Sequence, residues 1–403
     1  MKPRMTSSPW FLWPMLGALG AGLVACDGTV SIVGRRADAS DLDVQNDLGS
    51  LDVADASGDG PTDGSMDATK DVADVADASD GGNDVTDASD GSADAIDAGP
   101  PSPTRAVVSC GTVCQRPIDA VPNGLGNVVF FTAFTDMGEA AVYRATIPAA
   151  GMPPAMPALV VSGNGMEFPA GITISNDNAT LYVVDPVADR GTDAAMLGIG
   201  AIFAIPAAGG SARVLDIDIG LIHPQAVTIT SDGDGLLVSG QQRDAMGDIR
   251  RGIFRVARTG GGLPTVITTS LTSPSGVSQG PSPMNNIVAL DLRATGPNAG
   301  KALTVPTSGM PTDFATDLVG NHPAGLALAL DGRAALISGS SLAGTGGLLT
   351  WVNSAGMATS PPEYSTGMVT PVGLHRARTM DIWTIADEAA NETGQIFVFT
   401  TPR

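Results

Sequence analysis

The chain has 403 residues, and its 42 acidic side chains outnumber its 21 lysines and arginines, which gives a net charge of −21. Most of this excess lies in residues 27–103, which hold 19 aspartates, no glutamate and three cations, so residues 104–403 carry only −7. A negative folded part excludes a nucleic-acid-binding surface, because such surfaces attract phosphates with clustered lysine and arginine. The composition predicts three parts: residues 1–25, an acidic segment 26–103 and a folded region 104–403.

The first 25 residues have the features of a secretory signal. Lys2 and Arg4 precede an apolar stretch, residues 10–24, which is interrupted only by Pro14 and small glycines. This stretch is too short and too rich in glycine for a comfortable membrane span. A charged start followed by a short apolar region predicts a signal peptide.

The end of this stretch, Leu23-Val24-Ala25-Cys26, resembles the lipobox of bacterial lipoproteins, in which a branched residue and two small residues precede a cysteine. The resemblance implies cleavage before Cys26 and acylation of its thiol, for example with palmitate. Each buried methylene contributes about 0.8 kcal/mol, so two or more acyl chains give stable anchoring. We therefore expect a lipoprotein of the bacterial cell envelope, on the inner or the outer membrane and facing the periplasm or the exterior.

The acidic segment, residues 26–103, is expected to be a disordered tether. Between Asp71 and Asp97 the aspartates recur every three or four residues, a spacing at which like charges oppose a helix. The intervening Ala, Val, Ser and Gly cannot bury a core. A second hypothesis is weak binding of Ca²⁺ by segments such as residues 55–63, although none completes the EF-hand pattern with its closing glutamate.

Residues 104–403 contain an internal repeat. Each copy has a proline, a small residue two positions later, a short β-branched stretch, a tight polar turn and a second apolar stretch. A looser first copy and five clear ones begin at Pro117, Pro169, Pro224, Pro274, Pro323 and Pro371. A third apolar stretch, such as residues 200–206, and usually a weaker fourth, such as residues 264–268, complete the copy. Six repeats of four antiparallel strands predict an all-β, six-bladed propeller.

The last repeat ends after its third strand, while residues 105–109 precede the first blade and fit no strand of it. We expect this N-terminal segment to supply the outer strand of the last blade, because closing the ring removes an open sheet edge. Cys110 and Cys114 follow directly. With Cys26 lipidated, these two cysteines remain in an oxidising compartment, and we expect a disulfide between them.

The segment from Pro169 to Asp185, with its P-x-G start and Y-V-x-D end, resembles the NHL-repeat and gluconolactonase/regucalcin-like propellers. The resemblance covers residues 105–403 and implies the architecture. Calcium-dependent lactonases of this group hold their metal with a Glu, Asn and Asp set around the channel, the Glu coming from the first blade. That glutamate is missing after Pro117, and the inner strands carry instead Thr173, Thr228, Ser278 and Ala327. The departure argues against a lactonase.

Loop length indicates which end of the channel carries a site. The long loops follow the second strand of the last five blades: residues 185–199, 240–250, 291–300, 339–346 and 387–394. Binding residues tend to lie on long loops held by a rigid scaffold. Side chains on or beside these loops that we consider candidate ligand contacts are Asp185, Asp189, Arg243, Arg250, Asp291 and Asp387.

Two histidines stand at equivalent places in the repeat, His223 before Pro224 and His322 before Pro323, and Glu167 lies two positions before its repeat proline. One hypothesis joins these three side chains in a metal or acid–base site at the channel mouth. The alternative is that histidine followed by proline starts a strand, with the ring at the surface.

The sequence favours a membrane-anchored, monomeric binding or scaffold propeller whose partner is a protein, a small molecule or a glycan. No cofactor is required by this hypothesis. The alternative is an anchored hydrolase or oxidoreductase of the gluconolactonase-like type that uses a divalent metal or a quinone, with catalytic candidates Glu167, His223 and His322.

Overall fold

The computed structural model describes, beyond the backbone of residues 25–26 and 29–30, the residues 104–188, 200–215, 221–243, 246–292, 300–306, 309–315, 318, 322–341 and 346–400. At the N-terminal end, β1 (Ala25–Cys26) pairs with β2 (Thr29–Val30) in antiparallel fashion. The rest of the expected signal peptide and tether lies outside the described residues.

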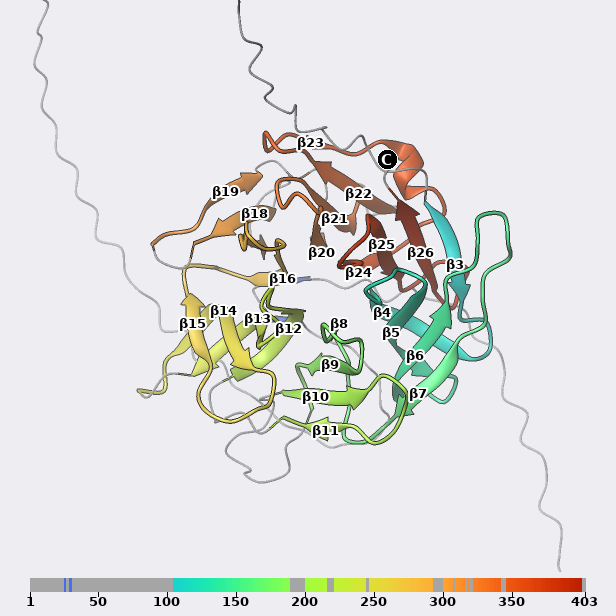
Figure 1. Cartoon of the computed structure of the whole chain (residues 1–403), viewed down its shortest axis with the longest axis horizontal. Helices are drawn as coiled ribbons and strands as arrows, with labels where there is room; N and C mark the ends of the chain where they lie inside the picture. The colour runs from blue at the N-terminus through green and yellow to red at the C-terminus, as the bar shows by residue number, and fades with distance from the viewer. Residues whose placement is uncertain are drawn as a thin grey trace, which may run out of the picture. The chain divides into compact units, whose positions relative to one another are not determined.

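Six sheets of four antiparallel strands surround a central axis, as Figure 1 shows. Blade 1 consists of β4 (Cys114–Pro122), β5 (Val128–Thr135), β6 (Ala140–Thr146) and β7 (Ala158–Ser162). Blade 2 consists of β8 (Gly171–Ile174), β9 (Thr180–Asp185), β10 (Ala201–Pro206) and β11 (Arg213–Val214). Blade 3 consists of β12 (Leu221–Ile229), β13 (Gly235–Arg243), β14 (Ile249–Ala257) and β15 (Thr265–Thr268).

The second half of the ring follows the same order. Blade 4 consists of β16 (Pro274–Gln279), β17 (Ile287–Leu292), β18 (Gly300–Val305) and β19 (Thr312–Ala315). Blade 5 consists of β20 (His322–Leu328), β21 (Ala335–Ser340), β22 (Gly347–Val352) and β23 (Ala358–Thr359). Blade 6 consists of β24 (Pro371–Arg376), β25 (Ile382–Asp387), β26 (Gln395–Thr400) and the N-terminal β3 (Arg105–Ser109).

The ring is closed by β3, which pairs with β26 and lies beside it in Figure 1 although the two strands come from opposite ends of the propeller. Val107 and Val108 of β3 are fully buried. The six-bladed propeller and its closure by an N-terminal strand are confirmed. The strand covers the edge of β26, which would otherwise present unpaired backbone groups.

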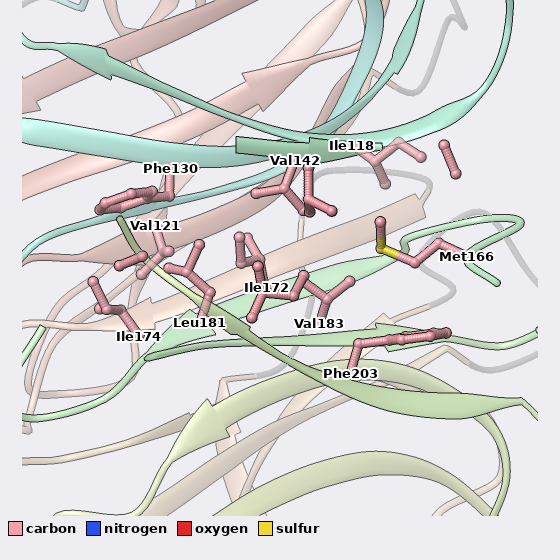
Figure 2. Packing of buried hydrophobic residues seen from close by; sticks show 14 of the residues in the cluster. Ile118, Val121, Phe130, Val142, Met166, Ile172, Ile174, Leu181, Val183 and Phe203 are labelled. Atoms are coloured by element: carbon pink, nitrogen blue, oxygen red, sulfur yellow. The ribbon is translucent and has the colours of Figure 1, made fainter. Parts of the chain in front are cut away.

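Each blade packs on the next through a layer of apolar side chains. Between blades 1 and 2, Ile118 and Phe130 face Leu181 and Phe203, as Figure 2 shows. Equivalent layers lie between the other neighbouring blades. Strands that are covered on both faces in this way carry nearly continuous apolar runs, such as Leu336-Ile337, rather than a strict alternation.

The innermost strand of each blade, here called the inner strand, explains the small residue two positions after each repeat proline. A Cβ added at Gly171 would press on the backbone of Ala226, and one at Gly325 would meet the backbone of Val372 in the next blade. Glycine or alanine therefore lets the inner strands approach one another around the axis. The short 3-10 helix η2 (Pro362–Ser365) lies in blade 5, and the described part holds no helix long and apolar enough to cross a membrane.

Candidate functional site

A pocket lies where the inner strands end and turn into the second strands, an end of the channel that we call the turn end. The cavity measures about 180 Å³. The fourth residue after every repeat proline lines it, and so does the fifth. The residues at the fourth position, which we call the channel positions, are Val121, Thr173, Thr228, Ser278, Ala327 and His375.

The channel positions are polar on one side of the ring. Blades 2, 3 and 4 contribute the hydroxyl groups of Thr173, Thr228 and Ser278. Blade 6 contributes His375, whereas blades 1 and 5 contribute only Val121 and an alanine. The threonine hydroxyls form no hydrogen bond with a described residue, and the Ser278 hydroxyl accepts one from the Leu328 amide at 3.2 Å. All three hydroxyl groups can therefore donate to a bound molecule.

His375 is held from behind by a buried carboxylate. Its Nε2 lies 3.0 Å from Oδ2 of Asp119, which is 3% exposed and also accepts a hydrogen bond from the Ile172 amide at 2.8 Å. Two residues after the repeat proline, where the other blades have glycine or alanine, blade 1 has Asp119. The carboxylate of Asp119 occupies the space that a side chain at position 373 would take, and Gly373 leaves this space empty. The pair fixes the imidazole so that its Nδ1, which bonds to no described residue, is left for the pocket.

Arg376 follows His375 and lines the same pocket. Its Nε donates to the Leu328 carbonyl oxygen at 2.7 Å, and its Nη1 donates to the Ala377 carbonyl oxygen at 2.5 Å. Burial lowers the pKa of the guanidinium group to about 10, against the opposing influence of Asp381 and Asp331. The lowered pKa means that the surroundings satisfy the positive charge less well than water does.

Arg378 extends from the turn of blade 6 across blade 1 to the turn of blade 2. Its guanidinium group donates to the carbonyl oxygens of Asn176 at 2.6 Å and Ser175 at 3.2 Å. The neighbouring Thr379 hydroxyl donates to the Gly124 carbonyl oxygen in blade 1 at 2.7 Å. Burial lowers the pKa of Arg378 also, while Asp177 raises it. Three blades are thus tied together around the cationic side of the pocket.

At the opposite end, the loop end, three of the expected candidates have structural contacts. Asp185 and Asp387 end the second strands of blades 2 and 6, and Asp291 is the next-to-last residue of the second strand of blade 4. All three are at most 2% exposed. Each carboxylate accepts hydrogen bonds from backbone amides of the segment that precedes the inner strand of its own blade. Asp387, for example, accepts from the amides of Val369 at 2.7 Å and Thr370 at 3.0 Å. These carboxylates hold the loops against the blades.

The histidines and the glutamate of the hypothetical channel-mouth site also lie at the loop end. Glu167 is exposed and uses its backbone amide, rather than its side chain, to bond to Asp185. His223 has a left-handed backbone with φ of 45°, beside a bulge of β12, and its Nδ1 lies 2.9 Å from the Pro186 carbonyl oxygen. His322 begins β20, and its side chain lies outside the described residues. Whether the three form a site stays a prediction.

The remaining candidates on the long loops are placed only in part. Arg243 and Arg250 are exposed at the ends of β13 and β14, whose pairing joins Gln242 to Arg250. Asp189 lies outside the described residues. Among the residues that are described, no group of three or more His, Cys, Asp or Glu side chains is arranged to hold a metal ion.

The cysteines fall into two classes. Cys110 and Cys114 form a disulfide and are almost fully buried at the seam between β3 and blade 1. Of Cys26 only the backbone is described, in β1. The thiol that the lipobox would acylate is thus separate from the disulfide.

The residues of the pocket were only partly visible in the sequence. Thr173, Thr228, Ser278 and Ala327 stand out there as positions facing the channel, but His375 and Arg376 do not. The repeat could have identified His375, because His375 lies four residues after Pro371, as the other channel positions lie four residues after their repeat prolines. Loop length directed attention to the opposite end.

No family model matches the chain, and no curated protein matches it. Among solved structures, a Hadza microbial sialidase is 12% identical, with a TM-score of 0.50, and the match covers 74% of this chain and 68% of that one. A gluconolactonase from Xanthomonas campestris is 12% identical, with a TM-score of 0.47 and coverage of 76% and 98%. A putative TolB from Agrobacterium tumefaciens is 14% identical, with a TM-score of 0.46 and coverage of 72% and 91%. The likeness concerns the fold alone.

Proposed function

We propose that this chain is a lipoprotein of the bacterial cell envelope whose propeller binds a small ligand in the pocket at the turn end. The observation that carries the binding function is that the same two repeat positions of all six blades line one cavity. A concave site with a few convergent polar groups on a rigid scaffold suits a small molecule better than a flat surface would.

The anchor rests on the sequence around Cys26, which has the order of residues that lipid transfer and cleavage require. The acidic segment would then serve as a tether. By flexible-chain scaling, the 77 residues from 27 to 103 span about 50 Å, and repulsion between aspartates extends the segment further. The propeller would thus sample a volume away from the membrane surface.

The binding function is tested by saturation-transfer NMR with a collection of small polar molecules. We expect some of them to bind the wild-type chain and to lose binding in Ser278→Phe, because the ring fills the pocket. Thr265→Phe, on the exposed outer strand of blade 3, is the matched control and should bind as the wild type does. If molecules that bind are unaffected by Ser278→Phe, the pocket is not the site.

The anchor is tested by metabolic labelling with palmitate in a bacterial host. We expect Cys26→Ser to abolish the label and to release the protein from the membrane fraction. Replacing Cys110 and Cys114 together by alanine is the control, since their thiols are joined in a disulfide and should carry no acyl chain. Equal labelling of Cys26→Ser and wild type would contradict the anchor.

A further inference from the structure

We infer that the pocket at the turn end binds a small anion in which a carboxylate, phosphate or sulfate group is joined to a hydroxylated body. This inference rests on the proposed binding function and specifies its ligand. The charged group of the ligand would lie against blade 6, and its hydroxyl groups would lie against blades 2, 3 and 4.

The charged side chains that line the pocket have one sign. They are Arg376 and Arg378, and the lining includes no aspartate or glutamate. This contrasts with residues 104–403 as a whole, which have a net charge of −7. The neighbouring Asp119 is already committed to His375 and to the backbone of Ile172. A positive pocket in a negative domain selects for an anion.

The guanidinium group of Arg376 has unused donors. Its partners are neutral carbonyl oxygens, and no carboxylate of the described residues forms an ion pair with it. Nη2 forms no hydrogen bond with a described residue. A partly buried charge without an ionic partner is costly, and the lowered pKa of Arg376 reflects this cost. An anionic ligand would accept hydrogen bonds from Nη2 and offset the burial of the charge.

The opposite side of the pocket indicates the rest of the ligand. Blade 3 lies across the ring from blade 6, and its Thr228 stands between Thr173 of blade 2 and Ser278 of blade 4. Hydroxyl groups both donate and accept hydrogen bonds, so they suit hydroxyl groups of a ligand. Val121 and Ala327 offer only apolar contacts on the two remaining flanks. A ligand with its charge at one end and hydroxyl groups at the other fits this division.

The experiment compares glycerol 3-phosphate, glycerate and glycerol, which share a hydroxylated body and differ in the anionic group. The full chain, purified in a non-ionic detergent and a buffer without phosphate or sulfate, is titrated by calorimetry. We expect the two anions to bind at least about tenfold more tightly than glycerol, because charge-assisted hydrogen bonds are about twice as strong as neutral ones. The relative affinities of the two anions distinguish a phosphate from a carboxylate ligand.

Variants connect the binding to the cations of the pocket. We expect Arg376→Gln to weaken the tighter anion about tenfold or more, and Arg378→Gln to weaken it about threefold. Arg333→Gln is the matched control, since Arg333 is exposed on the turn of blade 5, at the same end of the channel but outside the pocket. If Arg376→Gln does not fold, His375→Gln and Arg378→Gln carry the test.

The outcomes separate this inference from the function on which it rests. If glycerol binds as tightly as both anions and Ser278→Phe abolishes its binding, the pocket is a binding site but not for anions. If Arg333→Gln weakens the anions as much as Arg376→Gln does, the effect is one of overall charge, and the inference is wrong. If the small-molecule collection binds at the pocket but neither anion does, the ligand class is wrong while the binding function stands.

Discussion

The loop end and the turn end of the channel both hold charged groups, but these groups have different hydrogen-bond partners. At the loop end, Asp185, Asp291 and Asp387 accept hydrogen bonds from backbone amides of their own blades. At the turn end, Arg376 and Arg378 donate only to neutral carbonyl oxygens. A charge whose hydrogen-bonding groups are all taken up within the protein holds the fold, whereas a charge with free donors is available to a ligand. We therefore expect the loop-end carboxylates to serve the fold and the turn-end cations to serve the proposed ligand.

Both ends depend on blade 6, which carries Asp387 and Arg376, so the largest effect should come from opening that blade. Deleting residues 105–109 removes β3 and with it the fully buried Val107 and Val108. We expect a loss of more than about 4 kcal/mol in the free energy of unfolding, since each buried valine contributes about 1.5–3 kcal/mol. Urea unfolding followed by circular dichroism measures it.

The matched control is deletion of residues 71–75, five residues of the acidic segment before the propeller. This deletion should leave the unfolding midpoint unchanged. An unchanged midpoint after removal of residues 105–109 would contradict the closure of the ring by β3.

Removing a carboxylate at the loop end should have the next largest effect. In Asp387→Ala the amides of Val369, Thr370 and Ala390 lose a buried acceptor. We expect a loss of about 3 kcal/mol, because a hydrogen bond to a charged group contributes about 1.5–3 kcal/mol and the orphaned amides add a desolvation cost. Asp313→Ala, at an exposed ion pair with Lys301, should cost less than about 0.5 kcal/mol.

The same variant, Asp387→Ala, also gives a prediction for ligand affinity. Asp387→Ala should bind the pocket ligand as the wild type does at a temperature where the variant is folded. A drop in affinity comparable to that of Arg376→Gln would show that the two ends do not have separate roles.

A substitution between the two ends should affect both properties. The Cβ introduced by Gly373→Ala would collide with the carboxylate of Asp119, which must then release His375 or shift β24. We expect a loss of about 1–3 kcal/mol in stability, as is usual for overpacking, together with weaker ligand binding. Gly346→Ala, where the added carbon meets nothing closer than a carbonyl oxygen at 3.9 Å, should change neither property. Stability lost without any change in affinity would mean that Asp119 does not position His375 for the ligand.

The residues around Gly373 show which features the sequence predicts and which depend on tertiary packing. The repeat prolines predicted six blades, and the structure explains the small residue two positions later by the close approach of the inner strands. Asp119 breaks that rule in blade 1, and the rule alone does not tell which side chain its carboxylate reaches. The contact with His375 joins residues 256 positions apart and depends on the closure of the ring. Contacts of this kind follow from the tertiary packing rather than from local pattern.

The position of the pocket illustrates a second limit. Long loops favoured the loop end, yet the cavity described above is lined by inner-strand residues at the turn end. A rigid ring creates a pocket wherever its inward side chains are small, and Thr173, Ser278 and Ala327 are small for this place. Several of the long loops lie in part outside the described residues, so a further site there stays a prediction.

Apart from the control variants, the smallest effect on stability should come from a cation at the turn end. In Arg378→Gln two hydrogen bonds to carbonyl oxygens of blade 2 are lost or replaced, since an amide also donates to carbonyl groups. Burial already penalises the cation and lowers the pKa of Arg378, so a neutral side chain avoids that cost. We expect the free energy of unfolding to change by less than about 1 kcal/mol. The same urea titration measures it, and a loss as large as that of Asp387→Ala would show that Arg378 serves the fold, as the loop-end aspartates do.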